Sequence, residues 1–126
     1  YWCGARDQGN VRHFDKPARN DLHPTMKPVA LVERAIRNSS KPRDTVLDCF
    51  GGSGTTMIAA ERTGRRAVLL EIDPAYADVI VRRWQETTGE AAVLEGDDRI
   101  FADVAALRAK ENSSAMANTQ VQPGGN

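Results

Sequence analysis

Three observations predict an α/β fold of the Rossmann-like kind. First, the apolar stretch 45–48 ends in an acid and leads into a turn that has three glycines within positions 51–54. Second, apolar stretches alternate with helix-like segments from residue 45 onwards, as in parallel strands joined by helices. Third, the expected strands start at residues 45, 67 and 91, a spacing wide enough for right-handed crossovers. We therefore expect a βαβαβ half of such a fold, preceded by an N-terminal hairpin.

The N-terminal third is expected to hold that hairpin and one helix. Residues 1–5 and 11–14 are short and β-prone, and the polar segment between them suits a turn. Thr25 can cap a helix that runs to about Asn38 and tolerates Pro28 in its first turn. The face of this helix that we expect to be buried carries Val29, Leu31, Val32, Ala35 and Ile36.

The middle of the chain is expected to begin with a strand, a helix and a second strand. The first strand, residues 45–48, is followed by a predicted helix over 54–63. Gly64 supplies the stop signal for this helix, because glycine readily adopts the left-handed backbone that ends helices. The second strand is expected over 67–71, where the residues are apolar up to a closing acid.

The next helix has clear signals at both ends. Asp73 is an N-cap residue, and Pro74 occupies the first helical position, where a missing N–H costs nothing. The helix is expected to reach Thr88 and to end at Gly89. Its apolar stripe is predicted to consist of Tyr76, Ile80 and Trp84.

The last part of the chain is predicted to hold a strand, a helix and a tail. The third strand is expected over 91–95 and the final helix over 100–110. Residues 111–126 are rich in Ser, Asn, Gln and Gly, so we expect a disordered tail. The folded domain should then span residues 1–110.

Bulk composition leaves the class of partner open. The 126 residues suffice for one domain with a core, and 17 basic residues balance 17 acidic ones. The balance hides an asymmetry, since residues 1–43 hold nine basic and four acidic residues and so carry a net charge of +5. The remainder carries a net charge of −5. The basic part suits an anionic partner and an ordinary solvated face equally well.

Cysteine usage and hydropathy exclude other classes. Cys3 and Cys49 form neither a disulfide framework nor a metal-binding pattern. The sequence contains no signal peptide and no apolar run of membrane length, so we expect no membrane contact and a reducing, cytoplasmic location. The chain begins at Tyr1 instead of a methionine, which indicates a truncated or excised piece of a longer protein.

The glycine turn does not match two common nucleotide motifs. A phosphate-binding loop needs Lys and then Ser or Thr after its last glycine, whereas Gly54 is followed by Thr55 and Thr56. The dinucleotide fingerprint would start at Gly52, but Met57 stands at its third glycine position. Neither a triphosphate nor a dinucleotide therefore explains the turn.

Glu71 indicates a different cofactor. It ends the second strand, 17 residues beyond Gly54, where its carboxylate can accept hydrogen bonds from two ribose hydroxyls. A glycine turn without phosphate-binding residues, followed by such an acid, suits an adenosyl group that carries no pyrophosphate. S-Adenosylmethionine fits this description. A plain tight turn with a surface acid is the alternative, but the full order of strand, acid, glycine turn, helix, strand and acid favours the cofactor.

Three motifs extend this hypothesis through a family resemblance. They are His23-Pro-Thr-Met-Lys-Pro28, Asp48-Cys-Phe-Gly-Gly-Ser-Gly-Thr-Thr56 and Leu70-Glu-Ile-Asp-Pro74. Together they resemble the N4/N6 amino-group DNA methyltransferases of bacteria and phages, most of all the permuted subgroup in which the cofactor-binding half follows the catalytic half. The resemblance covers about residues 1–99. It implies a Rossmann-like S-adenosylmethionine-dependent methyltransferase fold, present here in part. Cys49 departs from the pattern, since the family usually has proline there.

The resemblance implies cofactor contacts along the glycine turn and at the start of the first helix. Thr25 and Lys27 would sit near the methionine carboxylate, where a cation or a helix N-terminus is also favoured on physical grounds. The residues that would line the methionine and ribose part of the cofactor are Asp48, Phe50, Gly51, Gly52, Ser53, Gly54 and Thr55.

The resemblance also implies contacts after the second and third strands. Glu71 would hold the ribose hydroxyls, and Ile72 and Asp73 would lie beside the adenine. Asp97 would approach the adenine amino group, a role for which Asp98 competes.

One catalytic element of the family is missing from this sequence. In the family, the amine of a flipped base is held by a loop of the form Asp/Asn/Ser-Pro-Pro-aromatic. The six prolines of the chain include no adjacent pair, so this loop is absent and would lie upstream of Tyr1. We therefore expect the chain alone to be inactive, and double-stranded DNA to be a partner of the full-length protein.

The leading hypothesis is the S-adenosylmethionine-binding part of a site-specific DNA methyltransferase that acts on an exocyclic amine. Adenine N6 is the preferred acceptor and cytosine N4 the alternative. A non-catalytic S-adenosylmethionine-binding module and a fragment of an RNA or small-molecule methyltransferase are the other hypotheses. Since the strand 45–48 would lack its usual neighbour, we also expect self-association or pairing with the missing catalytic half.

Overall fold

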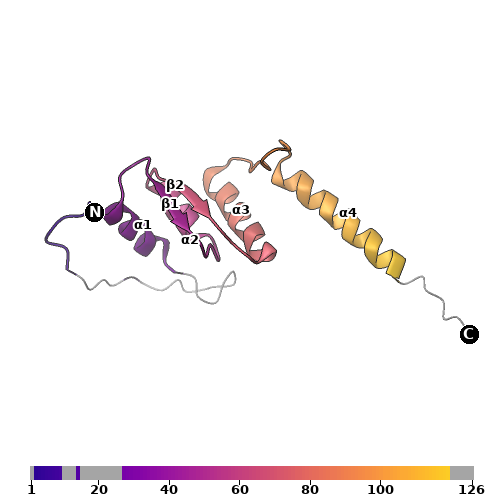
Figure 1. The fold of residues 1–126 in the computed structure, drawn as a ribbon, viewed down its shortest axis with the longest axis horizontal. Coiled ribbons are helices and arrows are strands. Elements are labelled where there is room, and N and C mark those ends of the chain that lie inside the picture. The colour runs from indigo at the N-terminus through magenta and orange to yellow at the C-terminus, as the bar shows by residue number, and fades with distance from the viewer. Residues whose placement is uncertain (1, 10–13, 15–26, 120–126) are drawn as a thin grey trace, which may run out of the picture. The chain divides into compact units, whose positions relative to one another are not determined.

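The computed structural model describes residues 2–9, 14 and 27–119, without the side chains of 115–119. The chain divides into two compact units, Tyr1–Glu90 and Ala91–Asn126, which are described separately. The first unit contains α1 (Val29–Ser39), β1 (Thr45–Asp48), α2 (Thr55–Arg62), β2 (Arg66–Leu69) and α3 (Pro74–Thr88); the second contains α4 (Phe101–Thr119) (Figure 1). The predicted class, a partial α/β fold, is confirmed.

The sheet of the first unit has two parallel strands. β1 and β2 lie side by side in register from Thr45 opposite Arg66 to Asp48 opposite Leu69, with α2 as the crossover between them (Figure 1). Both strands therefore end at the same edge of the sheet, where Asp48 leads into the glycine turn and Leu69 leads towards Glu71.

The predicted third strand is wrong. Residues 91–95 form no strand, and the pairing found there is an isolated antiparallel bridge between Val93 and Ile100. The backbone has positive φ at Gly96 (79°) and Asp98 (57°), which turns the chain back on itself. The N–H of Leu94 then donates to the carbonyl of Arg99 over 2.9 Å. A local turn thus takes up backbone groups that a strand would need for pairing within a sheet.

The predicted N-terminal hairpin is not formed by the residues that are described. Residues 2–9 contain no strand, and 10–13 lie outside the described part of the chain. The segment is instead joined to the end of α1, because the N–H of Cys3 donates to the carbonyl of Asn38 over 2.6 Å. The Asn38 side chain in turn donates to Gln8 over 2.9 Å.

The core of the first unit lies between α1, α2 and one face of the sheet. Its centre is made of Ile36, Ala59 and Ala60, against which Val29, Val32, Val46 and Ala67 pack. The two alanines let α2 come close to both neighbours, since they carry no more than a methyl group. Of the predicted face of α1, Ala35 is exposed. On the other face of the sheet, the register neighbours Leu47 and Val68 are 62% and 47% exposed.

The predicted ends of α3 are confirmed. Asp73 caps α3 by accepting a hydrogen bond from the N–H of Ala75 over 2.8 Å, with Pro74 in the first turn. Gly89 closes the same helix with φ 76°, and its N–H donates to the Gln85 carbonyl. The predicted stripe of α3 also faces inwards, with Ile80 buried. The predicted start of α1 is wrong: the helix begins at Val29, and Pro28 occupies its N-cap position instead of its first turn. The predicted N-cap residue, Thr25, itself lies outside the described residues.

The final helix is longer than predicted. α4 continues from Phe101 to Thr119, through nine residues that composition had placed in a disordered tail. The hydroxyls of Ser113 and Ser114 donate to carbonyls one turn earlier, so these polar residues fit into the helix. Residues 120–126 lie outside the described part. In that part no helix is both long and apolar enough to cross a membrane.

Candidate functional site

An open cavity of about 1040 Å³ lies at the carboxyl edge of the two strands. Ligands of open α/β sheets bind at this edge, because the loops that follow the strands meet there. Ten of the thirteen predicted site residues line it. The full lining consists of Lys27, Val32, Asp48, Cys49, Phe50, Gly51, Gly52, Ser53, Thr55, Thr56, Leu70, Glu71, Ile72, Asp73 and Tyr76.

The glycine turn forms the floor of this cavity. The N–H of Gly51 donates to the Leu70 carbonyl over 2.8 Å, and the N–H of Gly54 donates back to the Gly51 carbonyl over 2.9 Å. Gly54 has φ 78°, and a Cβ on it would lie 3.1 Å from Cγ1 of Ile80. Glycine is therefore required at this position for two reasons, the left-handed backbone and the close approach of α3.

Glu71 connects the turn to the start of α3. One carboxylate oxygen accepts from the N–H of Gly52 over 2.6 Å, and the other accepts from the N–H of Asp73 over 2.9 Å. The hydrogen bonds from Asp73 and Gly52 lower the pKa of Glu71, so the side chain is charged. Each carboxylate oxygen has a second lone pair, which leaves acceptors for hydroxyl groups of a ligand.

Asp48 is occupied by the turn itself. Its Oδ1 accepts from the N–H of Phe50 over 3.0 Å, and its Oδ2 accepts from the hydroxyl of Thr56 over 2.6 Å. The acid at the end of β1 thus ties both ends of the glycine turn together. Its predicted place at the cavity is observed, but its hydrogen bonds hold the loop.

Two large apolar side chains that line the cavity are exposed to solvent. Phe50 is 90% exposed and Ile72 is 99% exposed. Apolar side chains beside a few fixed polar groups are typical of sites for small planar ligands. The combination suits an adenosyl group, whose ring needs apolar contact and whose ribose needs acceptors.

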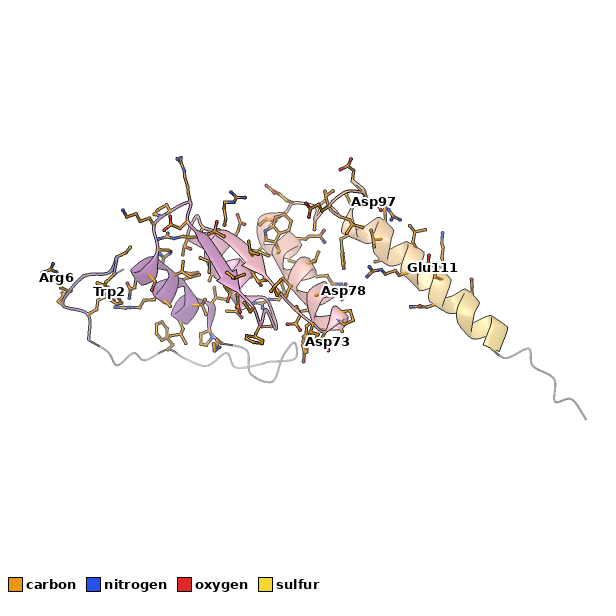
Figure 2. The ribbon with its side chains drawn as sticks, in the orientation of Figure 1. Trp2, Arg6, Asp73, Asp78, Asp97 and Glu111 are labelled. Atoms are coloured by element: carbon orange, nitrogen blue, oxygen red, sulfur yellow. The ribbon has the colours of Figure 1, made fainter. Side chains whose placement is uncertain are left out.

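The remaining predicted residues are placed as follows. Lys27 lines the cavity and is exposed, whereas Thr25 lies outside the described residues. Gly54 belongs to the turn but does not line the cavity. Asp97 belongs to the second unit and lies on the turn before α4 (Figure 2). Its carboxylate is paired with the Arg99 guanidinium. That pairing lowers the pKa of Asp97, and its predicted contact with adenine stays a prediction.

Five lining residues were not predicted from the sequence. Thr56 follows directly after the predicted Thr55, and its distance of eight residues from Asp48 fits a contact across the turn. Tyr76 lies in the first turn of α3, shortly after Asp73, and this position was a usable signal. Cys49 stands between the predicted Asp48 and Phe50, and this position was a signal too. Val32 and Leu70 gave no such signal, because apolar residues in a predicted helix or strand usually serve the core. Among the described residues, no group of His, Cys, Asp and Glu side chains is suited to a metal ion.

The fold and the cavity define a protein of the α/β class that has an open cavity at the carboxyl edge of its parallel strands, with a glycine turn that lacks the Lys of a phosphate-binding loop. The sequence also matches the model of a known family. The model of the DNA methylase family that acts on N6 and N4 amino groups matches residues 2–82, and the chain belongs to this family. Members of the family depend on S-adenosylmethionine, so the predicted class of cofactor is confirmed.

Curated relatives are similar over part of their length. The type II methyltransferase M1.MboII of Moraxella bovis is 50% identical in an alignment of 79 positions that covers 56% of this chain and 30% of the relative. The type II methyltransferase M.HinfI of Haemophilus influenzae is 44% identical over 85 residues, which are 68% of this chain and 23% of the relative. The chain therefore spans less than a third of either relative.

Solved structures agree with this assignment. The crystal structure of the M1.HpyAVI–SAM complex superposes with a TM-score of 0.58 at 30% identity, over 65% of this chain and 42% of the other. The putative DNA modification methylase TTHA0409 of Thermus thermophilus, complexed with S-adenosyl-L-methionine, superposes with a TM-score of 0.50 at 44% identity, over 58% and 31%.

Proposed function

We propose that this chain is the S-adenosylmethionine-binding part of a site-specific DNA methyltransferase. The full enzyme would transfer a methyl group to the exocyclic amine of a base, with adenine N6 preferred and cytosine N4 as the alternative. The observation that carries the proposal is Glu71, whose two oxygens are held by the backbone of Gly52 and Asp73 at the edge of the cavity.

The site residues would divide the cofactor between them. Glu71 would accept the ribose hydroxyls through its remaining lone pairs, and the glycine turn would let the backbone come close to the ligand. Ile72 and Asp73 would lie beside the adenine. Lys27 would offer its ammonium group to the methionine carboxylate, with Thr25 next to it. When bound, S-adenosylmethionine supplies the methyl group.

The acceptor amine needs groups that this chain does not contain. Its prolines lie at 17, 24, 28, 42, 74 and 123, so no Pro-Pro-aromatic loop is present. We propose that another part of the polypeptide, of the kind that makes up most of the two curated relatives, supplies this loop and the contacts with double-stranded DNA. The cytoplasm of a bacterial or phage-infected cell is the location that suits such an enzyme.

The missing loop also supports a second candidate, a non-catalytic module that binds S-adenosylmethionine. A methyl-transfer assay separates the two candidates. Two proteins are compared: this chain, and the longest natural polypeptide that contains its sequence. Each is incubated with unmethylated DNA and S-adenosylmethionine labelled in the methyl group, and the DNA is then digested to nucleosides. The enzyme proposal expects label in N6-methyladenine or N4-methylcytosine from the long form and none from the chain alone. A long form without label would favour the module.

Titration calorimetry tests the cofactor site directly. S-Adenosylmethionine should bind the folded chain, and Glu71→Ala should weaken binding about tenfold or more, because the ribose hydroxyls lose charged acceptors. Glu90→Ala is the matched control, since Glu90 is an exposed acid just after α3 and away from the cavity lining. No heat with the folded wild type would remove the proposal, and equal affinity of wild type and Glu71→Ala would remove Glu71 from it.

A further inference from the structure

We propose that Arg83 is a positioning residue that holds the glycine turn in its cofactor-binding geometry. The inference rests on the proposed function for the identity of the ligand. Arg83 lies on α3, does not line the cavity and was not singled out by sequence or resemblance. It contacts the turn at Ser53, the residue directly after the Gly52 that Glu71 holds.

The contact joins parts of the chain that are thirty residues apart. Nη1 of Arg83 donates to the carbonyl oxygen of Ser53, which lies between Gly52 and Gly54. Ser53 is 6% exposed and Arg83 is half-buried, so water competes little for this carbonyl. A hydrogen bond from a charged donor is stronger than one between neutral groups.

Partial burial of the Arg83 guanidinium costs free energy of solvation. Burial lowers the pKa of Arg83, while Glu86, one turn further along α3, partly counteracts this effect. In the described part of the chain no carboxylate lies within ion-pair distance of Arg83. A partly buried charge without an ion-pair partner is unfavourable unless its hydrogen bonds offset the loss of water. The bond to Ser53 is the contact that provides this offset.

Peptide geometry explains what the contact does to the turn. The peptide unit between Ser53 and Gly54 is planar and trans, so fixing the carbonyl on one side directs the N–H of Gly54 to the other. That N–H closes the turn by donating to the Gly51 carbonyl over 2.9 Å. The glycines have no side chains that could fix the turn through contacts of their own, and their backbone has more conformational freedom than that of other residues. Arg83 and Glu71 thus fasten the turn from two places in the chain.

The neighbouring arginine provides a matched control. Arg82 lies on the same helix, is exposed, and pairs with Asp78 over 3.5 Å, a contact within α3 (Figure 2 labels Asp78). Removing Arg82 deletes the same charge from the same helix without removing the hydrogen bond to Ser53. Arg83→Met keeps the apolar stem of the arginine but deletes every donor, and Arg83→Lys restores one charged donor.

Hydrogen exchange of the ligand-free protein tests the positioning role without any cofactor. The amides of residues 51–55 should exchange fastest in Arg83→Met, more slowly in Arg83→Lys and slowest in wild type and Arg82→Met. The amides in the middle of α3 should be equally protected in all four proteins, since the helix keeps its own hydrogen bonds. Wild-type exchange at 51–55 in both Arg83 variants would overturn the proposal.

Ligand affinity is the second readout. Arg83→Met should weaken S-adenosylmethionine binding about tenfold, and Arg83→Lys should recover part of this loss. Adenosine should be affected less, because Ile72 and Asp73 are not held by Arg83. If wild type binds no S-adenosylmethionine, the proposed function fails while the exchange experiment still decides the role of Arg83. Faster exchange at 51–55 with unchanged affinity for both ligands would also overturn the positioning role.

Discussion

Glu71 holds the glycine turn and the start of α3 with the same carboxylate that we propose as the ribose ligand. Its two oxygens accept backbone hydrogen bonds from Gly52 and Asp73 and still have lone pairs left for a ligand. The position of this residue was predictable, because the order of strand, acid, glycine turn, helix, strand and acid brings the ends of both strands to one edge of the sheet. Its contact with Gly52 was not predictable, since it depends on how closely the turn approaches the end of β2.

The lowered pKa of Glu71 predicts how the turn responds to acid. Since the folded-state pKa is below the unfolded value of about 4.5, the two hydrogen bonds are fully present above pH 4.5. They are lost as the pH falls through the lower, folded-state pKa. NMR should therefore show the Gly52 amide shift titrating with a midpoint below pH 4.5. In Glu71→Gln this titration step should disappear. A midpoint above 4.5 would contradict the observed hydrogen bonds.

At the scale of elements, local signals predicted both ends of α3 correctly and the last strand wrongly. An N-cap such as Asp73 and a terminating residue such as Gly89 act on their own helix, so neighbouring residues suffice to recognise them. A strand, in contrast, needs a partner. Residues 91–95 have the composition of a strand, but the positive φ at Gly96 and Asp98 turns the backbone into a local bridge.

The junction between the glycine turn, α2 and α3 predicts a difference between two glycines. Gly54 (φ 78°) and Gly64 (φ 69°) both have left-handed backbones, so alanine should cost about 1 kcal/mol at each. Only at Gly54 would the new methyl group also crowd Ile80, at 3.1 Å, whereas Gly64 has open space. Overpacking typically costs a further ~1–3 kcal/mol.

Thermal and urea unfolding followed by circular dichroism measure this difference. Gly54→Ala should unfold at a lower temperature and urea concentration than Gly64→Ala, and both should be less stable than wild type. Equal losses in the two variants would mean that the close packing of α3 on the turn contributes nothing to stability.

At the scale of the whole molecule, the first unit has a sheet with one covered face. Leu47 and Val68 are neighbours in the register and are exposed together on the other face. Exposed apolar strands with free edges promote association. We therefore expect the wild-type chain to have a mass above its monomer value of 13.8 kDa in solution.

Replacing both side chains tests this expectation. The double variant Leu47→Thr, Val68→Thr has β-branched residues suited to strands and removes apolar surface, so it should shift light-scattering masses towards the monomer. It should leave S-adenosylmethionine affinity unchanged, since neither residue lines the cavity. Leu107→Gln is the control, because Leu107 is similarly exposed (42%) but lies on α4. A monomeric wild type that melts cooperatively would contradict the prediction.

The strand–turn–helix–strand order, the glycine turn and Glu71 followed from the order of the residues, and the family resemblance supplied most of the other cavity residues. Turn glycines, cap residues and strand-ending acids act over a few positions, and parallel crossovers bring such strand ends to one edge whatever the remaining packing is. The length of α4 and the pairing of residues 91–95 were decided otherwise, because polar composition does not prevent a helix and a strand needs a partner. The contact of Arg83 with Ser53 also required the folded chain, since thirty residues and the packing of α3 separate donor from acceptor.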